Sequence, residues 1–577
     1  MSRAARKPQI RDVGRWRRHL LSGFVIAGAV VVGLRAFELQ VLDRAFLENE
    51  SAKRAIRHVE IPANRGAIVD RNGEPLAVSA PVESVWVVPA DLLAAPEHLQ
   101  AVARLLDRNS GALRRELEAR RDRQFYWLAR HLSPAEARRI TALNAPGVAT
   151  SREYRRFYPA GEIPAHIVGI TNIDGKGLEG VEAIDQQTLA GEPGKRRVIR
   201  ARDGRVVETG IEVKPARPGQ DVQLTIDLRL QYLAHRELKA AVQRHDAKGG
   251  MVVVVDARSG DILAMASSPG FNPNRRNAID RSAMRNRAMT DVFEPGSTVK
   301  PLLVAHALDR GLVDSGTRYQ TGDGWMQVGR LTVQDVHAYG EVDLTRMLKK
   351  SSNVGAAKLG LDMGAEAVFT AFDRFGFGKP LYMRFPGTAS GRLPFWRSWD
   401  EVEVATASYG YGLSSSALQL VRAYAALAND GQLPGLRLRT DEALVPPERV
   451  ISADAARQVR GMLRTVISED GTAARAAVPG FSVAGKTGTM RKVGAGGYSA
   501  DRHQGLFVGM LPAENPRLVG LVLIDEPRAG GFYGGVVAAP VFSRVMQGAA
   551  HWLQLSPRAP VVPGFTTAAT AEEEPRS

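Results

Sequence analysis

Three short motifs in this chain carry the side chains that a serine nucleophile requires. The first motif is Ser-Thr-Val-Lys, which runs from Ser297 to Lys300. The second is Ser-Ser-Asn, from Ser351 to Asn353, and the third is Lys-Thr-Gly-Thr, which begins at Lys486. A serine hydroxyl is a weak nucleophile until a base removes its proton. A lysine can act as that base when burial and a nearby cation lower its pKa. The residue types therefore predict acyl transfer by Ser297, with Lys300 as general base and Lys486 as the candidate cation.

The nucleophile motif is predicted to begin a helix. Residues 294–296 read Glu-Pro-Gly and interrupt the preceding chain. Pro301 is compatible with a helix start, because first-turn N–H groups have no intrahelical partner. Residues three apart share a helix face, so the Lys300 amine can reach the Ser297 hydroxyl. The N-terminus of such a helix adds positive potential where an oxyanion would develop.

Each motif also has an ordinary structural interpretation. A serine at a helix start is a common cap, Ser351 and Asn353 suit a polar turn, and the glycines beside Lys486 suit an exposed strand. The Ser-x-x-Lys pattern occurs once in the chain, however, and the other two motifs follow it in order. The structural interpretation requires three coincidences in that order, so the conjunction favours catalysis.

The N-terminus predicts a membrane anchor. Residues 20–34 carry no charge, and these 15 residues would span about 22 Å as a helix, against about 30 Å for a bilayer core. One acid, Asp12, precedes them together with seven basic residues: Arg3, Arg6, Lys7, Arg11, Arg15, Arg17 and Arg18. The positive-inside rule then predicts a cytoplasmic N-terminus and an external remainder. A cleaved signal peptide is the alternative, but its small-residue site, residues 27–29, lies within the apolar run.

Composition narrows the class further. A chain of 577 residues predicts at least two folded domains. It has no cysteine, which excludes disulfides and thiolate metal sites. Lys and Arg outnumber Asp and Glu by 77 to 61, a net charge of +16. These basic residues are spread along the chain without a zinc-finger or RNA-binding signature, so no nucleic-acid partner is expected.

The order of predicted elements indicates an α+β fold. Asp227 is expected to cap a helix whose apolar residues share one face. Residues 251–256 and 261–267 form one predicted antiparallel pair, residues 505–511 and 518–524 a second, and a helix follows at about 539–553. In the N-terminal part, Asn72-Gly73 predicts a hairpin, residues 91–145 predict helices, and residues 216–220 predict a linker. Arg65 and Asp70 either stabilise this hairpin by a salt bridge or transmit contact with partner proteins.

The chain resembles the class B penicillin-binding proteins. The three motifs in this order are shared by serine β-lactamases and penicillin-binding proteins. Wider stretches resemble the division-specific septal transpeptidases of Gram-negative bacteria: 291–301, 350–355, 409–412, 533–535 and 539–542. Two others resemble the class B pedestal, 65–73 and 177–182. Elongation-type relatives tend to carry Asp where Asn353 stands, which favours the septal branch.

The resemblance implies five segments along the chain. They are a cytoplasmic tail (1–19), a transmembrane anchor (20–42), a mixed α/β non-catalytic pedestal of the dimerisation type (43–215), a transpeptidase domain (216–555) and a disordered tail (556–577). The transpeptidase domain is expected to contain an antiparallel sheet flanked by helices, as β-lactamases do. The protein would then sit in the bacterial inner membrane with its catalytic domain in the periplasm.

The resemblance also implies residue roles. Ser297 would attack the penultimate D-alanine of a stem peptide, and Lys300 would act as base. Ser351, hydrogen-bonded between Lys300 and Lys486, would relay a proton to the leaving amine. Asn353 would orient the substrate amide. The terminal carboxylate would bind at Lys486, Thr487, Gly488 and Thr489, and the backbone N–H groups of Ser297 and Thr489 would form the oxyanion hole. No metal or cofactor is expected.

Expected partners are D-Ala-D-Ala stem peptides, β-lactams, the membrane, a SEDS-type glycan polymerase and other divisome proteins. The nearest enzyme alternatives are an elongation-type transpeptidase, a DD-carboxypeptidase and a β-lactamase. After Asn353, no Glu-x-x-Leu-Asn element supplies a deacylating glutamate of the best-known β-lactamase class. A non-enzymatic β-lactam-binding sensor or scaffold is the alternative from another class, and only about 19 residues precede the anchor for a sensor's output.

Overall fold

The computed structural model describes residues 14–39, 56–200, 206–385, 387–494 and 497–557. The chain divides into two compact units. The first contains Met1–Ala63, Val82–Glu153 and Glu192–Arg217, and the second contains Asn64–Pro81, Tyr154–Gly191 and Pro218–Ser577. The division falls inside strands β3 (Pro75–Val87) and β5 (Val148–Phe157). The domain boundary at residues 215 and 216 therefore stays a prediction.

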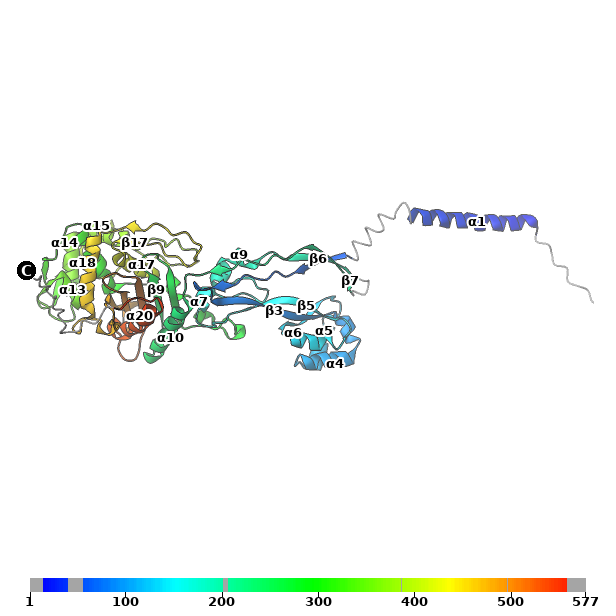
Figure 1. Cartoon of the computed structure of the whole chain (residues 1–577), viewed down its shortest axis with the longest axis horizontal. Coiled ribbons are helices and arrows are strands. Elements are labelled where there is room, and N and C mark those ends of the chain that lie inside the picture. The colour runs from blue at the N-terminus through cyan, green and yellow to red at the C-terminus, as the bar shows by residue number, and fades with distance from the viewer. Residues whose placement is uncertain (1–13, 40–55, 201–205, 386, 495–496, 558–577) are drawn as a thin grey trace, which may run out of the picture. The chain divides into compact units, whose positions relative to one another are not determined.

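Near the N-terminus, residues Arg15–Phe37 form the helix α1 (Figure 1). Its 23 residues correspond to about 35 Å, because the helix begins before the uncharged run and extends beyond it. Within Trp16–Phe37, a window of 18 residues has a mean hydropathy of 2.1, and none of that window is buried. The helix is long and apolar enough to cross a bilayer. Residues 40–42 of the predicted anchor lie outside the described part of the chain.

The first unit combines a small sheet with a helical cluster. Strands β1 (Ile56–Ile61), β6 (Gly194–Arg200) and β7 (Val206–Lys214) pair antiparallel in the order β1-β6-β7. The helices α3 (Pro89–Leu93), α4 (Pro96–Leu105), α5 (Ser110–Glu118) and α6 (Pro134–Thr141) enclose a separate apolar core. The all-helical prediction for residues 91–145 is wrong at β4 (Tyr126–Leu132), which pairs with the end of β3. Aromatic residues at the start of β4 favour a strand there.

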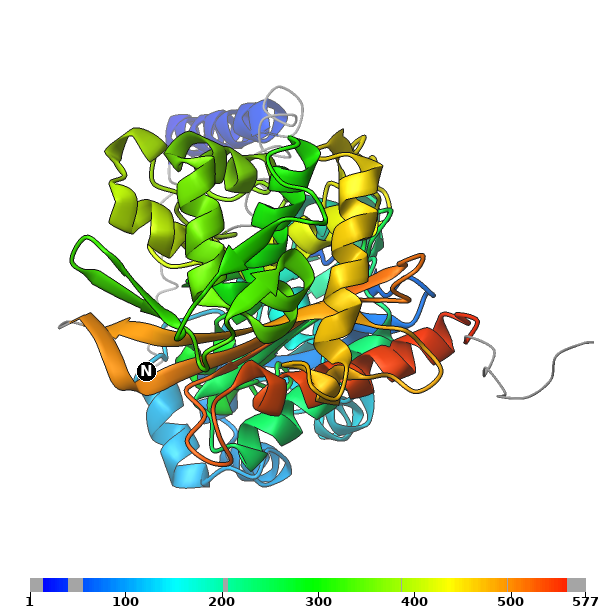
Figure 2. The same cartoon turned by 90° about the vertical axis from the view of Figure 1, so that its left-hand side faces the viewer.

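The second unit is built on a five-stranded antiparallel sheet. Its order is β10 (Ile262–Ser268), β9 (Gly249–Asp256), β21 (Leu518–Asp525), β20 (Gly497–Leu511) and β19 (Ala484–Gly494). Both predicted strand pairs are confirmed, and β9 joins them by pairing with β21. The helices α10 (Leu228–Arg244) and α20 (Ala539–Trp552) pack on one face, and α17 (Ala417–Ala428) packs on the other (Figure 2). The predicted α+β fold is confirmed.

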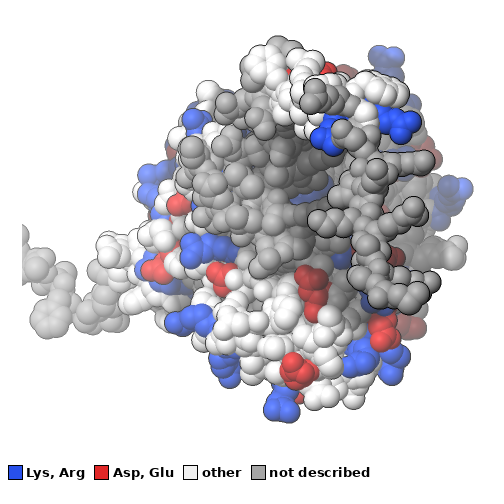
Figure 3. Space-filling view, turned by 90° about the vertical axis from the view of Figure 1, so that its right-hand side faces the viewer, with Lys and Arg blue, Asp and Glu red and all other residues white. Residues whose placement is uncertain are grey.

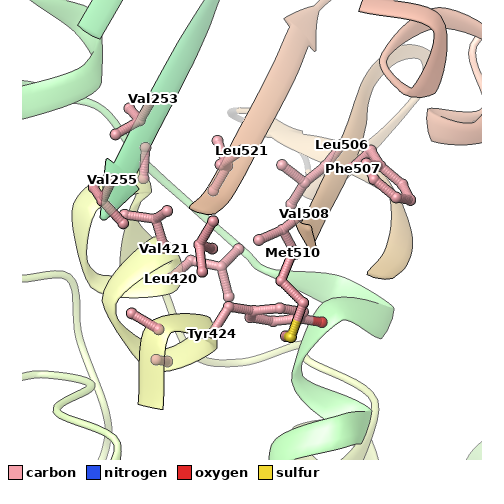
Figure 4. Packing of buried hydrophobic residues seen from close by; sticks show 14 of the residues in the cluster. Val253, Val255, Leu420, Val421, Tyr424, Leu506, Phe507, Val508, Met510 and Leu521 are labelled. Atoms are coloured by element: carbon pink, nitrogen blue, oxygen red, sulfur yellow. The ribbon is translucent and has the colours of Figure 1, made fainter. Parts of the chain in front are cut away.

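The central strands are apolar at successive positions because both faces of the sheet are covered. Every residue of β10 and β21 is buried, and so is every residue of β9 except its last. Figure 4 shows Val253, Val255, Leu521 and Val508 from the strands packed against α17. A continuous apolar run is the pattern expected of a fully buried strand. This core holds β19, the edge strand that carries the third motif.

The Asn72-Gly73 hairpin is confirmed and is tied to α10. Gly73 adopts φ +88°, and the Asp70 carboxylate accepts from the backbone N–H groups of Asn72 (2.7 Å) and Glu74 (2.9 Å). The other Asp70 oxygen accepts from Leu228 N at 2.9 Å, at the start of α10. Asp70 is fully buried, so it lies within the fold rather than on a contact surface.

Arg65 is likewise part of the interior. Its Nε donates to Glu182 Oε2 at 2.7 Å, while Arg156 Nε donates to Glu182 Oε1 at 2.6 Å. All three side chains are nearly inaccessible, and a buried carboxylate between two guanidinium groups keeps every charge paired. The geometry favours the structural interpretation of Arg65 and Asp70 over a role in contacting partners.

The predicted helix cap and linker have different outcomes. Asp227 caps α10 through Arg229 N (3.1 Å) and Leu230 N (3.5 Å), as predicted. Within the stretch predicted as a linker, Gly219 N donates to Asn64 O at 2.8 Å, and a Cβ on Gly219 would lie 1.8 Å from a backbone oxygen. Packing holds this end of the stretch in place. Residues 558–577 of the predicted disordered tail lie outside the described residues.

The charge of the chain is not gathered into one patch on the face drawn in Figure 3. There, the basic and acidic side chains of the described residues are interspersed. A nucleic-acid site normally shows a continuous basic stripe. Despite the net charge of +16, that face therefore has no continuous basic surface to which a polyanion could bind.

Candidate active site

Ser297 lies in a tight turn at the start of a helix. A 3₁₀ turn, Gly296–Val299, leads directly into α12 (Lys300–Asp309). The helical segment begins where the sequence predicts, but its first turn is tighter than an α-helix. Gly296 adopts φ +53°, and a Cβ there would lie 3.0 Å from a carbon of Met490, so glycine suits the position. Ser297 itself is half-buried.

Lys300 is fully buried and has two strong acceptors. Its Nζ donates to Ser351 O at 2.7 Å and to Asn353 Oδ1 at 2.7 Å. A neutral amine has two hydrogens and one lone pair, so these acceptors can take both hydrogens and leave the lone pair free. Among the hydrogen bonds of the described residues, none joins Lys300 to the Ser297 hydroxyl. Such catalytic contacts are often long before substrate binds.

Ser351 and Asn353 lie at the junction of two helices, α13 (Leu344–Lys350) and α14 (Asn353–Met363). Ser351 adopts the left-handed conformation, φ +62°, which is uncommon for a residue with a side chain. The reversal directs its hydroxyl toward both lysines. Lys486 Nζ lies 2.9 Å from Ser351 Oγ, and Lys300 Nζ lies 3.5 Å from the same oxygen. The structure thus brings together the second motif and a lysine from each of the other two.

The third motif lies in β19. Lys486 is fully buried, and Thr487 Oγ1 lies 3.0 Å from Thr472 Oγ1. A Cβ on Gly488 would lie 3.1 Å from Thr298 Cγ2 and 3.2 Å from a backbone oxygen. Glycine at this position lets the strand lie directly against the turn that carries Ser297. Thr489 Oγ1 accepts from Gly534 N at 3.2 Å.

Burial and repulsion set the charges of the two lysines. Burial lowers the pKa of Lys300 well below 10.5, and the nearby Lys486 charge lowers it further. Burial lowers the pKa of Lys486 to about 7. The repulsion between the two charges is mutual, so it favours loss of one proton from the pair. The neutral amine is the form that a general base requires.

Asp335, which orients the second motif, was not predicted from the sequence. It follows β14 (Leu331–Gln334) and belongs to no recognised pattern. Its carboxylate accepts from Ser352 Oγ (2.6 Å), Val354 N (3.0 Å) and the backbone N–H of Asn353. Asn353 Nδ2 donates to the neighbouring Gln334 O at 2.9 Å, which turns Oδ1 toward Lys300. The negative charge of Asp335 raises the pKa of Lys300, opposing the effect of burial.

A cleft of about 720 Å³ is lined by residues from all three motifs and is open to a ligand. Of the described residues, Asp470 supplies the one carboxylate in the lining, and it is paired with Lys349 (2.7 Å) and Lys350 (3.4 Å). The lining contains Ser297, Ser351, Asn353, Thr487, Thr489, Lys350, Arg475 and Arg491. The excess of cations suits an anionic ligand. A groove of about 710 Å³ between α10 and α20 contains no motif residue, and among the described residues no three His, Asp or Glu side chains are grouped to hold a metal.

Two family models match the chain. The model described as the penicillin binding protein transpeptidase domain matches residues 250–547, and the penicillin-binding protein dimerisation domain matches residues 60–224. The first range includes all three motifs and the whole five-stranded sheet apart from the first residue of β9.

Individual relatives extend over nearly the whole chain. A probable peptidoglycan D,D-transpeptidase of Pseudomonas aeruginosa, PbpC, is 41% identical and covers 92% of this chain and 94% of its own. The peptidoglycan D,D-transpeptidase FtsI of Escherichia coli is 39% identical, with 94% and 93% covered. A crystal structure of a peptidoglycan synthetase from Bifidobacterium adolescentis is 26% identical, with 88% and 98% covered and a TM-score of 0.69.

The lysine pair predicts how the reactivity of Ser297 depends on pH. With an uncharged acylating probe, the rate should rise as Lys300 loses its proton and should reach its plateau well below pH 10.5. With an anionic probe the rate should in addition decline above about pH 7, as Lys486 loses its charge. Stopped-flow rates for both probes from pH 4 to 11 provide the measurement. A rate that climbs until pH 10 with both probes would show that Lys300 titrates as an ordinary lysine.

Proposed function

Because the chain belongs to the penicillin-binding protein transpeptidase family, we propose that it is a peptidoglycan D,D-transpeptidase that cross-links stem peptides through an acyl-enzyme on Ser297. The observation that carries the proposal is the continuous set of contacts from Lys486 through Ser351 to Lys300, beside a half-buried serine in a cation-lined cleft. The names of the similar proteins PbpC and FtsI support the same reaction.

In the first half-reaction, Lys300 takes the Ser297 hydroxyl proton while Oγ bonds to the carbonyl carbon of the penultimate D-alanine. The backbone N–H groups of Ser297 and Thr489 stabilise the oxyanion. As the intermediate collapses, the bond to the terminal D-alanine nitrogen breaks. Ser351 protonates that nitrogen and regains a proton from Lys300, whose Nζ lies 3.5 Å from the Ser351 hydroxyl. Free D-alanine leaves, and an ester on Ser297 remains.

In the second half-reaction, an amine from a neighbouring stem peptide attacks the ester. Lys300 accepts the proton that the amine loses and returns it to Ser297 Oγ as the ester bond breaks. The products are a new amide cross-link and the free serine. Both half-reactions use the same base, so they require Lys300 to be neutral at the start of each.

Substrate binding uses the third motif and Asn353. Lys486, Thr487, Gly488 and Thr489 bind the terminal carboxylate, with the Lys486 charge and the threonine hydroxyls as donors. Asn353 orients the substrate amide. β-Lactams imitate the D-Ala-D-Ala terminus and acylate Ser297 at the same site.

Transfer to an amine is favoured over hydrolysis by the lining of the cleft. A hydrolase that discharges the ester needs a group to activate water. Among the described residues, the one carboxylate in the lining is Asp470, and its pairing with Lys349 and Lys350 leaves it poorly suited to activate water. A DD-carboxypeptidase, or an inactive scaffold, would differ in the fate of the ester, and stem-peptide turnover with and without an acceptor amine separates these outcomes.

The proposal extends to location and partners. Residues 43–215 form the non-catalytic pedestal and residues 216–555 the transpeptidase domain, as the two family-model ranges support. The helix α1 anchors the protein in the inner membrane, with the N-terminus in the cytoplasm and the catalytic domain in the periplasm. Similarity to FtsI supports a septal role, with a SEDS-type glycan polymerase and other divisome proteins as partners.

Replacing Ser297 with Ala should abolish covalent labelling by a fluorescent penicillin, because the substitution removes the attacking oxygen. Ser398, an exposed serine in the same unit, provides the control, and Ser398→Ala should label normally. Gel fluorescence and peptide mapping locate the adduct, and thermal unfolding checks that both variants are folded. Normal labelling of a folded Ser297→Ala protein would contradict the assignment.

The seven basic residues before the uncharged run at residues 20–34 predict the topology. A reporter that is active only outside the cytoplasm should be active when it is fused after residue 60, because the chain beyond the anchor is predicted to lie outside. N-terminal sequencing of the membrane-bound protein should find residues 1 to 27 attached, which a cleaved signal peptide forbids. A fusion at that position that accumulates without reporter activity would remove the catalytic domain from its proposed substrate.

A further inference from the structure

The turn that carries Ser297 lacks part of the usual helical support. Pro301 has no amide hydrogen, so the carbonyl of Ser297, four residues earlier, has no donor at the α-helical position. The segment Gly296–Val299 is accordingly a 3₁₀ turn. Thr298 Oγ1 donates to Pro295 O at 2.6 Å, a contact within the turn itself. The position of the turn must therefore be fixed by contacts from other elements.

Two of these contacts are backbone approaches from the sides. Gly296 N donates to Gly410 O at 3.1 Å, and a Cβ on Gly410 would lie only 2.1 Å from Gly296 O. On another side, Gly488 of β19 lies against Thr298. These approaches limit where the turn can move, but neither comes from the core beneath it.

The contact from the core is made by Tyr424 of α17. Its side chain is fully buried, and its hydroxyl donates to Thr298 O at 2.8 Å. Figure 4 shows the ring packed with Leu420, Val421 and Met510, with the oxygen at its far end. Burial raises the pKa of Tyr424 well above 10, so the hydroxyl keeps its hydrogen. The rigid ring and the surrounding core give this donor one position.

We propose that Tyr424 is a positioning residue for the nucleophile. The Tyr424 hydroxyl holds the turn in the position from which Ser297 Oγ can reach the lone pair of Lys300 Nζ. The inference rests on the proposed acyl-enzyme function. A misplacement of about 1 Å in a reacting atom can cost about a hundredfold in rate. Loss of the hydroxyl should therefore affect the covalent step more than the binding step, because the cleft residues that contact a ligand stay in place.

The test is Tyr424→Phe, with Tyr158→Phe as the matched control. Tyr158 is also a buried tyrosine of the second unit, and its hydroxyl accepts from the backbone N–H of Thr171 at 3.1 Å. Neither Tyr158 nor Thr171 lines the cleft. Both substitutions remove one hydroxyl and leave one buried backbone group without its partner, so their effects on stability should be similar.

Stopped-flow acylation by a chromogenic cephalosporin separates non-covalent affinity from the acylation rate constant. Tyr424→Phe should lower the rate constant about tenfold or more and change the affinity less than about twofold. Tyr158→Phe should leave both unchanged while lowering Tm by a similar amount. A folded Tyr424→Phe protein with the parent rate constant, or an equal loss of rate in Tyr158→Phe, would overturn the positioning role.

Two further results keep the outcome interpretable. If the parent protein itself forms no adduct at Ser297, the proposed function fails, and that result is distinct from a failure of this inference. If Tyr424→Phe does not accumulate, 4-aminophenylalanine at position 424 keeps a donor at the same place. Its rate constant should stay within about twofold of the parent, and a folded protein with a tenfold loss would overturn the proposal.

Discussion

Two buried lysines on either side of one serine hydroxyl are the feature on which the rest of this site depends. Lys300 and Lys486 both lie within hydrogen-bonding reach of Ser351 Oγ, at 3.5 and 2.9 Å. Because both amines contact the same oxygen, their charges lie close together, and two unit charges roughly 5 to 6 Å apart repel by on the order of 3 kcal/mol at an effective dielectric of about 20. Burial adds to that cost, so the pair is stable only if it holds fewer than two charges much of the time. The repulsion thus yields a neutral amine, which is what general-base catalysis requires.

The fold can be understood as the means of bringing this pair together. Lys300 lies at the start of α12 and Lys486 in the edge strand β19, 186 residues later in the chain. The left-handed backbone at Ser351 and the missing Cβ at Gly488 allow three separate elements to meet. Asp335 supplies the opposing charge and fixes the α13–α14 junction. The buried central strands make this edge rigid, which keeps the lysines from separating and taking up solvent.

The sequence alone indicated the groups that we propose to react, because their chemistry restricts residue type and order. Ser297, Lys300, Ser351 and Lys486 were identified in this way, and the structure brings the last three into contact. Local rules also predicted the Asp227 cap and the Asn72-Gly73 hairpin, since both depend on neighbours in sequence. The 3₁₀ turn at Ser297 was missed because the effect of Pro301 on the carbonyl four residues earlier was not followed through.

Residues that act through tertiary contacts could not be predicted. Asp335 and Tyr424 belong to no motif, and their roles arise from partners that only folding brings close. Arg65 illustrates the same limit: its partner is Glu182, 117 positions away, and not a residue of the hairpin. Strand β4 was missed for a related reason, since pairing with β3 decided its conformation against a helix-rich surrounding sequence.

The charge state of Lys300 is the central claim, and NMR of the protein with isotope-labelled lysine side chains tests it most directly. Titration of the Cε and Nζ resonances, with assignments from Lys300→Arg and Lys486→Arg, reports each amine separately. The account predicts that the Lys300 resonance titrates well below 10.5, and that the Lys486 resonance titrates near 7. A Lys300 amine that stays charged up to pH 9 or above in the folded protein would contradict it.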